Sequence, residues 1–495
     1  MKPRPEIFLL ASALTVLAFL AFYRLLVAGF TFASISEAAL LLTPHLMVAM
    51  LAASRLWVGI ALGGIGLAFS IPLPLMQRLE FGMILVGLLL VLVLLRYAFI
   101  SRKHALIASA EDHLMAVVAV VILTRILYDR PGSAATGETG GLAEAFYFGL
   151  GTLSYFMMAR LTGAGEWAVR PTFRVMIVIL TIGAIVQRVL SGMEVGWAVT
   201  VVVGGLFGLQ LWFLSAMVLS WALVRANRTD HTRVPQILPY LVMIGTMILS
   251  VITPFRSRPM FAVGIVIAVA YVHGKLRRLG TTALAGLGLV MLLWFVGGPE
   301  RIPFVVTRSL STIMPVSNDM AVEYSTTFKS SSEFGWVSEF RAELNEMAWE
   351  RIRERPIAGK GFIFTRDELF MQAFASGSQK EMMAQLALSG IYHNTVVELA
   401  VFCGLPLTAL FVLAYLISLV KFIRFAPGIG DPGFRMLAAA MLGFFVAESG
   451  QMLMNGGGRD FYYICLLMGA MRGMRVLMAA REPGAEPAAA GVVVA

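Results

Sequence analysis

Residues 396–420 read VVELAVFCGLPLTALFVLAYLISLV, an apolar run whose one charged side chain is Glu398. A helix needs about 20 predominantly apolar residues to cross a hydrocarbon layer of about 30 Å. Backbone groups in lipid must be hydrogen-bonded within the protein, so a run of this length predicts a membrane-spanning helix. Similar runs recur along most of the chain. The sequence therefore predicts an all-α polytopic membrane protein.

Composition supports the same class. The 495 residues are 59% hydrophobic and 14% charged, whereas a soluble chain is nearer half apolar and one quarter charged. The net charge of +10 comes from short basic clusters between apolar runs, without the basic stripe and interleaved aromatics of a nucleic-acid surface. We therefore expect membrane lipids and no nucleic acid as partners. Cys403 and Cys465 lie in apolar runs and are expected to be small buried hydrophobes.

About fourteen spans are predicted. The first follows Met1-Lys2-Pro3-Arg4-Pro5 and is too long for a signal-peptide core, so we expect it to be retained. The spans lie at approximately 7–28, 36–54, 57–76, 81–100, 112–128, 142–160, 172–190, 196–224, 236–253, 259–274, 279–297, 396–420, 435–454 and 460–478.

The basic residues fix the expected orientation. With the N-terminus in the cytoplasm, nearly every basic cluster falls in a cytoplasmic loop, as the positive-inside rule requires. The alternate loops include the Gly-rich acidic stretch 129–141. Both termini are therefore predicted to be cytoplasmic. The clusters contain Arg55, Arg102, Lys103, Arg160, Arg170, Arg174, Arg225, Arg228, Arg233, Lys275, Arg277, Arg278, Lys421, Arg424, Arg472, Arg475 and Arg481.

One long segment on the outer side contains no membrane-length run. Within it, 339–355 carries Leu344, Met347, Ala348 and Ile352 at helical spacing among polar residues, which predicts an amphipathic surface helix. This helix either rests on the protein or headgroups or contacts substrate. The predicted organisation is N-terminal transmembrane helices in 1–235, further transmembrane helices in 236–297, a large outer loop in 298–395, C-terminal transmembrane helices in 396–480 and a disordered tail in 481–495.

Arginines occur at two places on the outer side, and the first pair goes against the charge trend. Arg256 and Arg258 lie at a predicted span boundary in TPFRSRP. They either extend to lipid phosphates or form a clamp for a phosphate or diphosphate, which guanidinium groups bind in a bidentate manner. Arg341 begins the amphipathic helix, which ends in the glycine turn PIAGKGF from Pro356.

His393 is the one histidine that this threading places at the outer surface. Histidine is the usual general base near neutral pH, although a lone histidine is more often structural. Asn394 and Thr395 can cap the helix that follows. Glu398 lies within lipid depth, where a carboxylate is costly and suggests a partner or a site.

These residues resemble the O-antigen ligase and O-antigen polymerase superfamily over about Gln236 to Gly457. Three pieces match in order: Ser257-Arg258 at a span boundary, then Arg341, Trp349, Pro356, Gly359 and Gly361, then His393, Asn394, Glu398 and Gly404. Proline follows Arg258 where the family often has glycine, so Arg256 is a second candidate at that corner. Arg459 and Asp460 in the last outer loop are further candidate contacts.

The resemblance implies a GT-C-like membrane glycosyltransferase of the bacterial inner membrane, with its active site facing the periplasm. The donor would be a glycan on undecaprenyl diphosphate, and the acceptor a hydroxyl of a glycan, of lipid A-core or of another molecule. It implies that His393 deprotonates the acceptor and that Arg258 and Arg341 bind the diphosphate. No metal or other cofactor would be needed. The product would be lipopolysaccharide O-antigen or exopolysaccharide.

Three alternatives remain open. The protein could join repeat units as a polymerase instead of acting as a ligase, since both reactions need the same base and clamp. A protein hydroxyl could be the acceptor. Outside this class, a solute or ion transporter would need broken helices in two corresponding halves, and breaks such as that at Pro72 and Pro74 are not mirrored in a second half.

Overall fold

The computed structural model describes residues 72–73, 76–80, 109–129, 140–163, 216, 219–220, 257–277, 333–362, 392, 394–454 and 456–479. The regular structure of this part is helical, apart from one short antiparallel hairpin of β1 (Pro72–Leu73) and β2 (Met76–Glu80). The hairpin replaces the end of the predicted span 57–76. Pro72 has no backbone N–H to donate, so the residue cannot continue a helical hydrogen-bond ladder.

The chain divides into two compact units. One comprises Met1–Ala108, Leu153–Leu211 and Arg472–Ala495, and the other comprises Ser109–Thr152 and Trp212–Met471. Most of the described helices belong to the second unit. Helix α5 (Ala110–Asp129) therefore folds with helices that follow Trp212 in the sequence.

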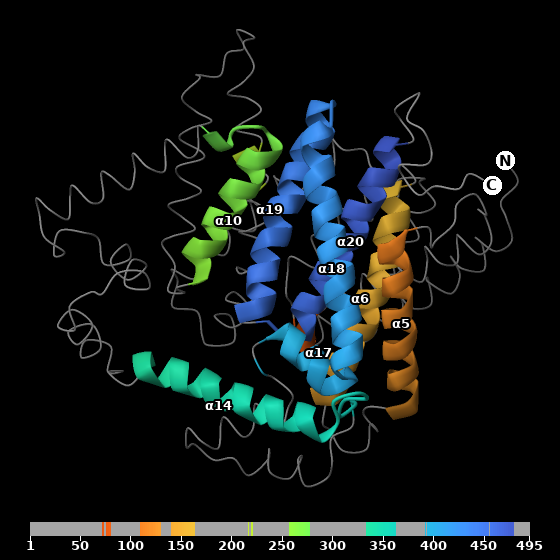
Figure 1. Cartoon of the computed structure of the whole chain (residues 1–495), viewed down its shortest axis with the longest axis vertical. Helices are drawn as coiled ribbons and strands as arrows, with labels where there is room; N and C mark the ends of the chain where they lie inside the picture. The colour runs from red at the N-terminus through yellow and green to blue at the C-terminus, as the bar shows by residue number, and fades with distance from the viewer. Residues whose placement is uncertain are drawn as a thin grey trace, which may run out of the picture. The chain divides into compact units, whose positions relative to one another are not determined.

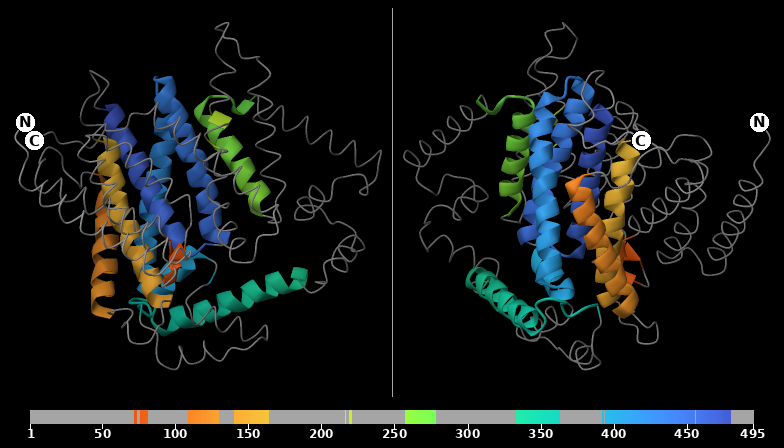
Figure 2. Two further views of the ribbon diagram at one scale, coloured as in Figure 1. Left: turned by 180° about the vertical axis from the view of Figure 1, so that it is seen from behind. Right: turned by 45° about the vertical axis from the view of Figure 1, so that its right-hand side comes forward.

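Figures 1 and 2 show the helices of the second unit. Helices α5, α10, α18 and α19 run roughly side by side, and α14 crosses one end of them. Three segments are long and apolar enough to cross a membrane: Leu405–Gly428, Pro432–Met454 and Asp460–Ala479. The described part of the chain thus has the helices of a membrane protein, as the apolar runs predict. The helices after α5 are α6 (Gly140–Gly163), α10 (Ser257–Val272), α14 (Glu333–Glu354), α17 (Thr395–Cys403), α18 (Leu405–Phe425), the 3-10 turn η2 (Ala426–Gly428), α19 (Pro432–Met454) and α20 (Gly458–Ala479).

Local sequence sets where these helices begin. Ser109 precedes α5, and both its backbone N–H and its hydroxyl donate to the carboxylate of Asp112, three residues on. Asp431 precedes α19 and accepts hydrogen bonds from the N–H groups of Gly433 and Phe434. In both cases an aspartate side chain accepts hydrogen bonds from backbone N–H groups at the helix start, where such groups have no intrahelical partner.

Contacts between the helices define two ends of the unit. Helix α10 packs antiparallel to α19, because Phe261 meets Gly450 while Ile265 and Val269 meet Gly443. One end, here called the cationic end, holds Lys275 after α10, Lys421 and Arg424 in α18, and Arg435 in α19. The other end, here called the glycine end, holds Gly359, Gly361, Gly404 and Gly456–Gly458.

Helix α5 joins the same two ends. Near its start, Glu111 pairs with Lys421 of α18 at the cationic end. At its other extremity, Asp129 contacts Gly361 at the glycine end. Helices α5 and α19 therefore run from the cationic end to the glycine end, whereas α10 and α18 run in the opposite direction.

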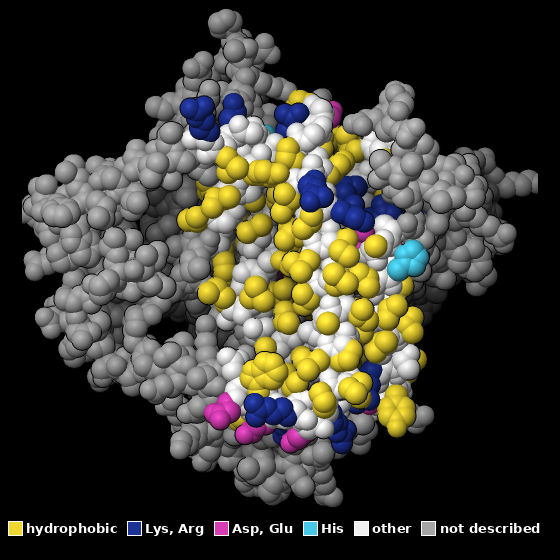
Figure 3. Space-filling view, in the orientation of Figure 1, with side chains coloured by type: hydrophobic (Ala, Val, Ile, Leu, Met, Phe, Trp, Pro, Cys, Tyr) yellow, Lys and Arg dark blue, Asp and Glu magenta, His cyan; other side chains and the backbone are white. Residues whose placement is uncertain are grey.

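Apolar side chains are exposed along two of these helices. In α5 they are Val117, Val120, Val121, Leu127 and Tyr128, and in α18 they are Leu405, Leu413, Leu416 and Val420. Several of them lie three or four residues apart, as Val117 and Val120 or Leu413 and Leu416 do, and so share one face of the helix. Figure 3 shows that apolar side chains cover this face, with lysine and arginine side chains at both of its ends. Such a surface suits contact with lipid.

Five predicted spans coincide with observed helices to within a few residues, namely 112–128, 142–160, 259–274, 435–454 and 460–478. The predicted single span 396–420 is instead two helices, α17 and α18, which are separated at Gly404. The remaining predicted spans lie wholly or mostly outside the described residues.

Candidate functional site

The start of α17 carries the motif with the predicted base. Asn394 is the N-cap, as expected, and its side chain accepts hydrogen bonds from the N–H groups of Val396 and Val397. The N–H of Tyr392 donates to Oε1 of Glu398 at 3.0 Å. The predicted base, His393, lies outside the described residues. Tyr392 and Asn394, on either side of His393, are thus both hydrogen-bonded to residues of α17.

Glu398 is the carboxylate that the sequence places at a costly depth. Its side chain is fully buried, and a buried carboxylate needs hydrogen-bond donors to offset its lost hydration. The Tyr392 amide is one such donor. Glu398 therefore fixes the backbone next to His393, a role that its spacing of five residues from His393 permits.

The glycine turn between α19 and α20 lies against the start of α17. The hydroxyl of Thr395 donates to the carbonyl oxygen of Gly457 at 2.9 Å. The N–H of Gly457 donates to Asp460, and the N–H of Gly458 donates to Glu144 of α6. Asp460 and Glu144 are both buried. Asp460, which the sequence singled out as a possible contact, thus bonds the backbone at the start of its own helix.

The loop from Pro356 to Phe362 ends α14 and contains the G-x-G motif. Gly359 and Gly361 have φ values of 68° and 86°, in the left-handed region that favours glycine. An added Cβ at Gly359 would lie 2.5 Å from the carbonyl group of Phe402, and one at Gly361 would overlap the side chains of Asp129 and Arg125. Both glycines are therefore required for close packing.

Backbone hydrogen bonds join this loop to the break between α17 and α18. The N–H of Lys360 donates to Val401 at 2.6 Å, and the N–H of Gly361 donates to Phe402 at 2.9 Å. In the opposite direction, the N–H of Leu405 donates to Pro356 at 2.8 Å. These bonds satisfy carbonyl and amide groups that the interruption of the helix leaves without intrahelical partners.

Two residues of α5 complete this junction, and the sequence interpretation missed both. Asp129 is buried and accepts a hydrogen bond from the N–H of Phe362 at 2.8 Å. Nε of Arg125 lies 2.9 Å from the same carboxylate oxygen, and its Nη2 lies 3.5 Å from the carbonyl oxygen of Gly359. The available signal was an arginine and an aspartate four residues apart at the end of a predicted span, where charged side chains are uncommon.

Aromatic packing encloses the junction. The rings of Phe362 and Phe402 are stacked with centroids 5.2 Å apart. Phe148 of α6 lies 6.1 Å from both rings and 4.9 Å from Phe461 of α20. The loop is thus anchored by side-chain packing as well as by its backbone bonds.

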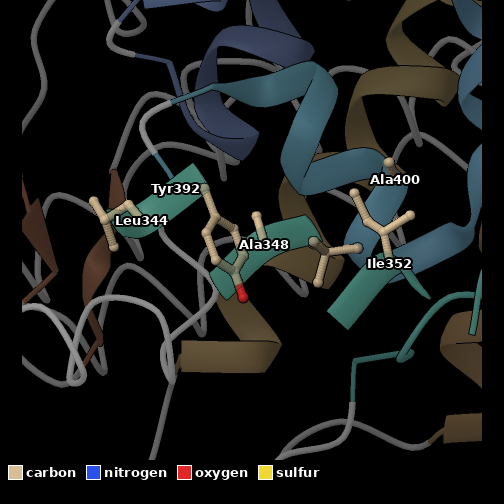
Figure 4. Close-up of a cluster of buried hydrophobic side chains, with 6 residues drawn as sticks. Leu344, Ala348, Ile352, Tyr392 and Ala400 are labelled. Carbon is tan, nitrogen blue, oxygen red and sulfur yellow. The ribbon is translucent and has the colours of Figure 1, made fainter. Parts of the chain in front are cut away.

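Helix α14 is the predicted amphipathic helix, and it packs on the protein. Leu344, Ala348 and Ile352 occupy one face and are buried with Tyr392, Ala400 and Val401. Figure 4 shows these side chains between α14 and α17. On the opposite face, Trp349 is 52% exposed, so the tryptophan of the motif is available at the surface.

The predicted arginines are distributed over three helices at or near the glycine end. Arg258 is the second residue of α10, Arg341 lies in α14, and Arg459 is the second residue of α20. Their side chains are outside the described residues, as is all of Arg256. The start of α10 lies at the glycine end because Phe261 packs on Gly450.

Two described histidines lie at the cationic end. His113 is exposed, and Nε2 of His273 lies 2.9 Å from the hydroxyl of Ser220. Among the residues that the structure describes, no three His, Cys, Asp or Glu side chains are grouped to hold a metal ion.

Comparison of the chain with models of known protein families and with curated proteins finds no match.

Proposed function

We propose that the protein is a membrane glycosyltransferase of the O-antigen ligase or polymerase type. It transfers a glycan from undecaprenyl diphosphate to an acceptor hydroxyl on the periplasmic face of the bacterial inner membrane. The observation that carries the proposal is that three separate motif pieces lie toward the same end of one helical unit. These are the start of α10 with Arg258, the loop Pro356–Phe362 after α14, and the capped turn before α17.

The opposite end supports the proposed orientation. Lys275, Lys421, Arg424 and Arg435 gather there, and cationic loops favour the cytoplasmic side. Arginines also lie at the glycine end, but in α14 they alternate with glutamates. The glycine end then faces the periplasm. Fourteen spans with both termini in the cytoplasm remain part of this proposal.

The proposed chemistry needs a base and a stabilised leaving group. His393 takes the proton of the acceptor hydroxyl, whose oxygen attacks the anomeric carbon of the donor. The bond from that carbon to the diphosphate oxygen breaks, and the undecaprenyl diphosphate leaves with the electron pair. Arg258 and Arg341 stabilise the negative charge that develops on it. Attack from the side opposite the leaving group inverts the anomeric centre.

The acceptor distinguishes the two activities in this class. A ligase uses a hydroxyl of lipid A-core or another carrier, whereas a polymerase uses the terminal sugar of a second lipid-linked chain. A lipid-linked glycan profile of a deletion strain separates them, because loss of a polymerase leaves single repeat units and loss of a ligase leaves joined chains on the lipid.

An in-vitro transfer assay tests the proposal. Purified protein is given undecaprenyl-linked donor and a glycan acceptor, with and without chelator. We expect His393→Ala to lower kcat by about 10²–10⁴-fold without loss of donor binding. His113→Ala is the matched control, because this exposed histidine lies at the cationic end. Arg258→Lys and Arg341→Lys should also lose most activity, since lysine cannot bind diphosphate in a bidentate manner.

The outcomes separate the candidate mechanisms. Near-wild-type rates for His393→Ala contradict the proposed base, and full activity in the lysine variants contradicts the diphosphate clamp. Inhibition of the wild type by chelator indicates transfer assisted by a metal.

A transporter is the second candidate, and the break at Gly404 is the observation that favours it. Transporters bind substrates at discontinuous membrane helices, and α17 and α18 are such a pair. Uptake by proteoliposomes that contain the purified protein, in the absence of any transfer product, would favour this function over the transferase.

A further inference from the structure

We infer that Asp129 of α5, together with Arg125, is a positioning residue that holds the loop Pro356–Phe362 for the proposed transfer reaction. The inference rests on the proposed function and extends it to a helix outside the region of family resemblance, which covers about 236–457. It gives part of the N-terminal region a defined role at the site.

Three successive amides of the loop are held in different ways. The N–H groups of Lys360 and Gly361 donate to carbonyl oxygens of α17, and the N–H of Phe362 donates to Asp129. Asp129 therefore joins this loop to α5, beside the longer contact of Arg125 with the carbonyl oxygen of Gly359. A hydrogen bond to a buried carboxylate is roughly twice as strong as one between neutral groups.

Arg125 completes the arrangement. Its Nε lies 2.9 Å from the Asp129 oxygen that also accepts from Phe362. The ion pair compensates the buried carboxylate and restricts its rotamer. The positive φ of Gly361 lets the loop backbone approach this pair, since a Cβ there would overlap both side chains.

The loop contributes to the position of α14, which also packs on α17 through its buried apolar face. The loop begins directly after α14, which extends about 20 Å from Arg341 to its last residue, Glu354. A tilt of about 3° at the loop would displace Arg341 by about 1 Å over that length. A misplacement of this size can reduce an enzymatic rate by about 10²-fold.

The structure also provides a matched control at the other end of the same helix. Glu111 is fully buried and pairs with Lys421 of α18. Its substitution removes a buried carboxylate and an ion pair from α5, as substitution of Asp129 does, but leaves the loop bonds in place.

The first measurement is hydrogen exchange of the loop in the purified full-length protein, which does not depend on activity. We expect Asp129→Ala to speed exchange in a peptide containing residues 360–362 by about tenfold or more, because it removes a hydrogen bond to a charged acceptor. Glu111→Ala should leave this peptide unchanged. Asp129→Asn keeps an oxygen that can accept the hydrogen bond from Phe362, so it should retain most of the protection from exchange. This variant also replaces Asp129→Ala in the measurement if Asp129→Ala does not fold.

The second measurement is steady-state kinetics in the transfer assay. Asp129→Ala should lower kcat by about 10²-fold while the acceptor KM changes less than threefold, and Asp129→Asn should recover part of kcat. If hydrogen exchange of the loop is unchanged in Asp129→Ala, Asp129 does not hold the loop. If exchange changes but kcat stays at the wild-type value, Asp129 has no role in the reaction. A wild-type protein without transferase activity overturns the proposed function, while the exchange result still decides whether Asp129 holds the loop.

Discussion

Gly404 controls the geometry between α17 and α18. Its φ is 86°, and a Cβ at this position would overlap the carbonyl oxygen of Ile357. The same short segment carries the hydrogen bond from Leu405 to Pro356. A side chain at position 404 must therefore disturb both the helix break and the loop that packs on it.

Gly404→Ala is predicted to destabilise the protein. Gly404 has ψ of 163° as well as positive φ, a conformation found almost only at glycine, and it alone costs about 1–3 kcal/mol for a residue with a Cβ. The overlap with Ile357 adds to this cost. Thermal unfolding of the purified protein in detergent measures the effect. Gly428→Ala is the control, because Gly428 lacks a positive φ and has open space around it. Equal melting temperatures for the two variants would contradict the packing role of Gly404.

Individual residues differ in how far the sequence predicted them. The cap at Asn394 was predictable, because an asparagine before an apolar run has few other reasons to be there. The hydrogen-bond partner of Glu398 could not be predicted, because Tyr392 donates through its backbone N–H, a group that does not depend on the residue type. Asp129 was missed because its partner, Phe362, is 233 residues away in the sequence.

At the scale of elements, α14 is held by a small apolar face. Leu344, Ala348 and Ile352 are spaced four residues apart and meet the surface formed by Tyr392, Ala400 and Val401. The alanines allow the two helices to approach closely. This contact places α14 next to Tyr392, which precedes α17.

Ala348→Asp is predicted to detach α14. The substitution introduces a carboxylate without a partner into a fully buried position, which costs several kcal/mol. Faster tryptic cleavage after Arg351 and Arg353 would report the release of the helix. Asn345→Asp introduces the same charge on the exposed face of α14, and trypsin should cleave this variant at the wild-type rate. A similar rate for both variants would show that the buried face does not hold α14.

The sequence predicted α14 well and the α17–α18 segment poorly. The apolar period of α14 is readable along its length, and the predicted bounds 339–355 differ from Glu333–Glu354 mainly at the start. Residues 396–420 are apolar on both sides of Gly404, so local composition favours a continuous helix. The break depends on hydrogen bonds to Pro356 and on the loop, which are tertiary contacts.

At the scale of the whole molecule, basic side chains lie at both ends of the described second unit, and in α14 at the glycine end they alternate with glutamates. Grouping of Lys275, Lys421 and Arg424 at one end agrees with the threading from the basic clusters. The number of spans and the side of the membrane that each end faces stay predictions.

Thiol labelling of intact spheroplasts tests the orientation. Ile357 at the glycine end is 77% exposed, and Gly430 near the cationic end is also exposed. We expect Ile357→Cys to react with a membrane-impermeant maleimide and Gly430→Cys to react only after lysis. The native Cys403 and Cys465 are buried and should give little background. The reverse pattern would place His393 on the cytoplasmic side and contradict the proposed active site.

The link between Asp129 and Phe362 also affects how the protein is made. The ribosome completes α5 long before the partner amide, 233 residues later, is synthesised. During this interval the carboxylate already has a partner, because Arg125 lies one helical turn away in the same helix. The pair can therefore enter the bilayer as a compensated unit. The final connection to the loop then depends on late-synthesised segments, and truncation before Phe402 would leave it incomplete.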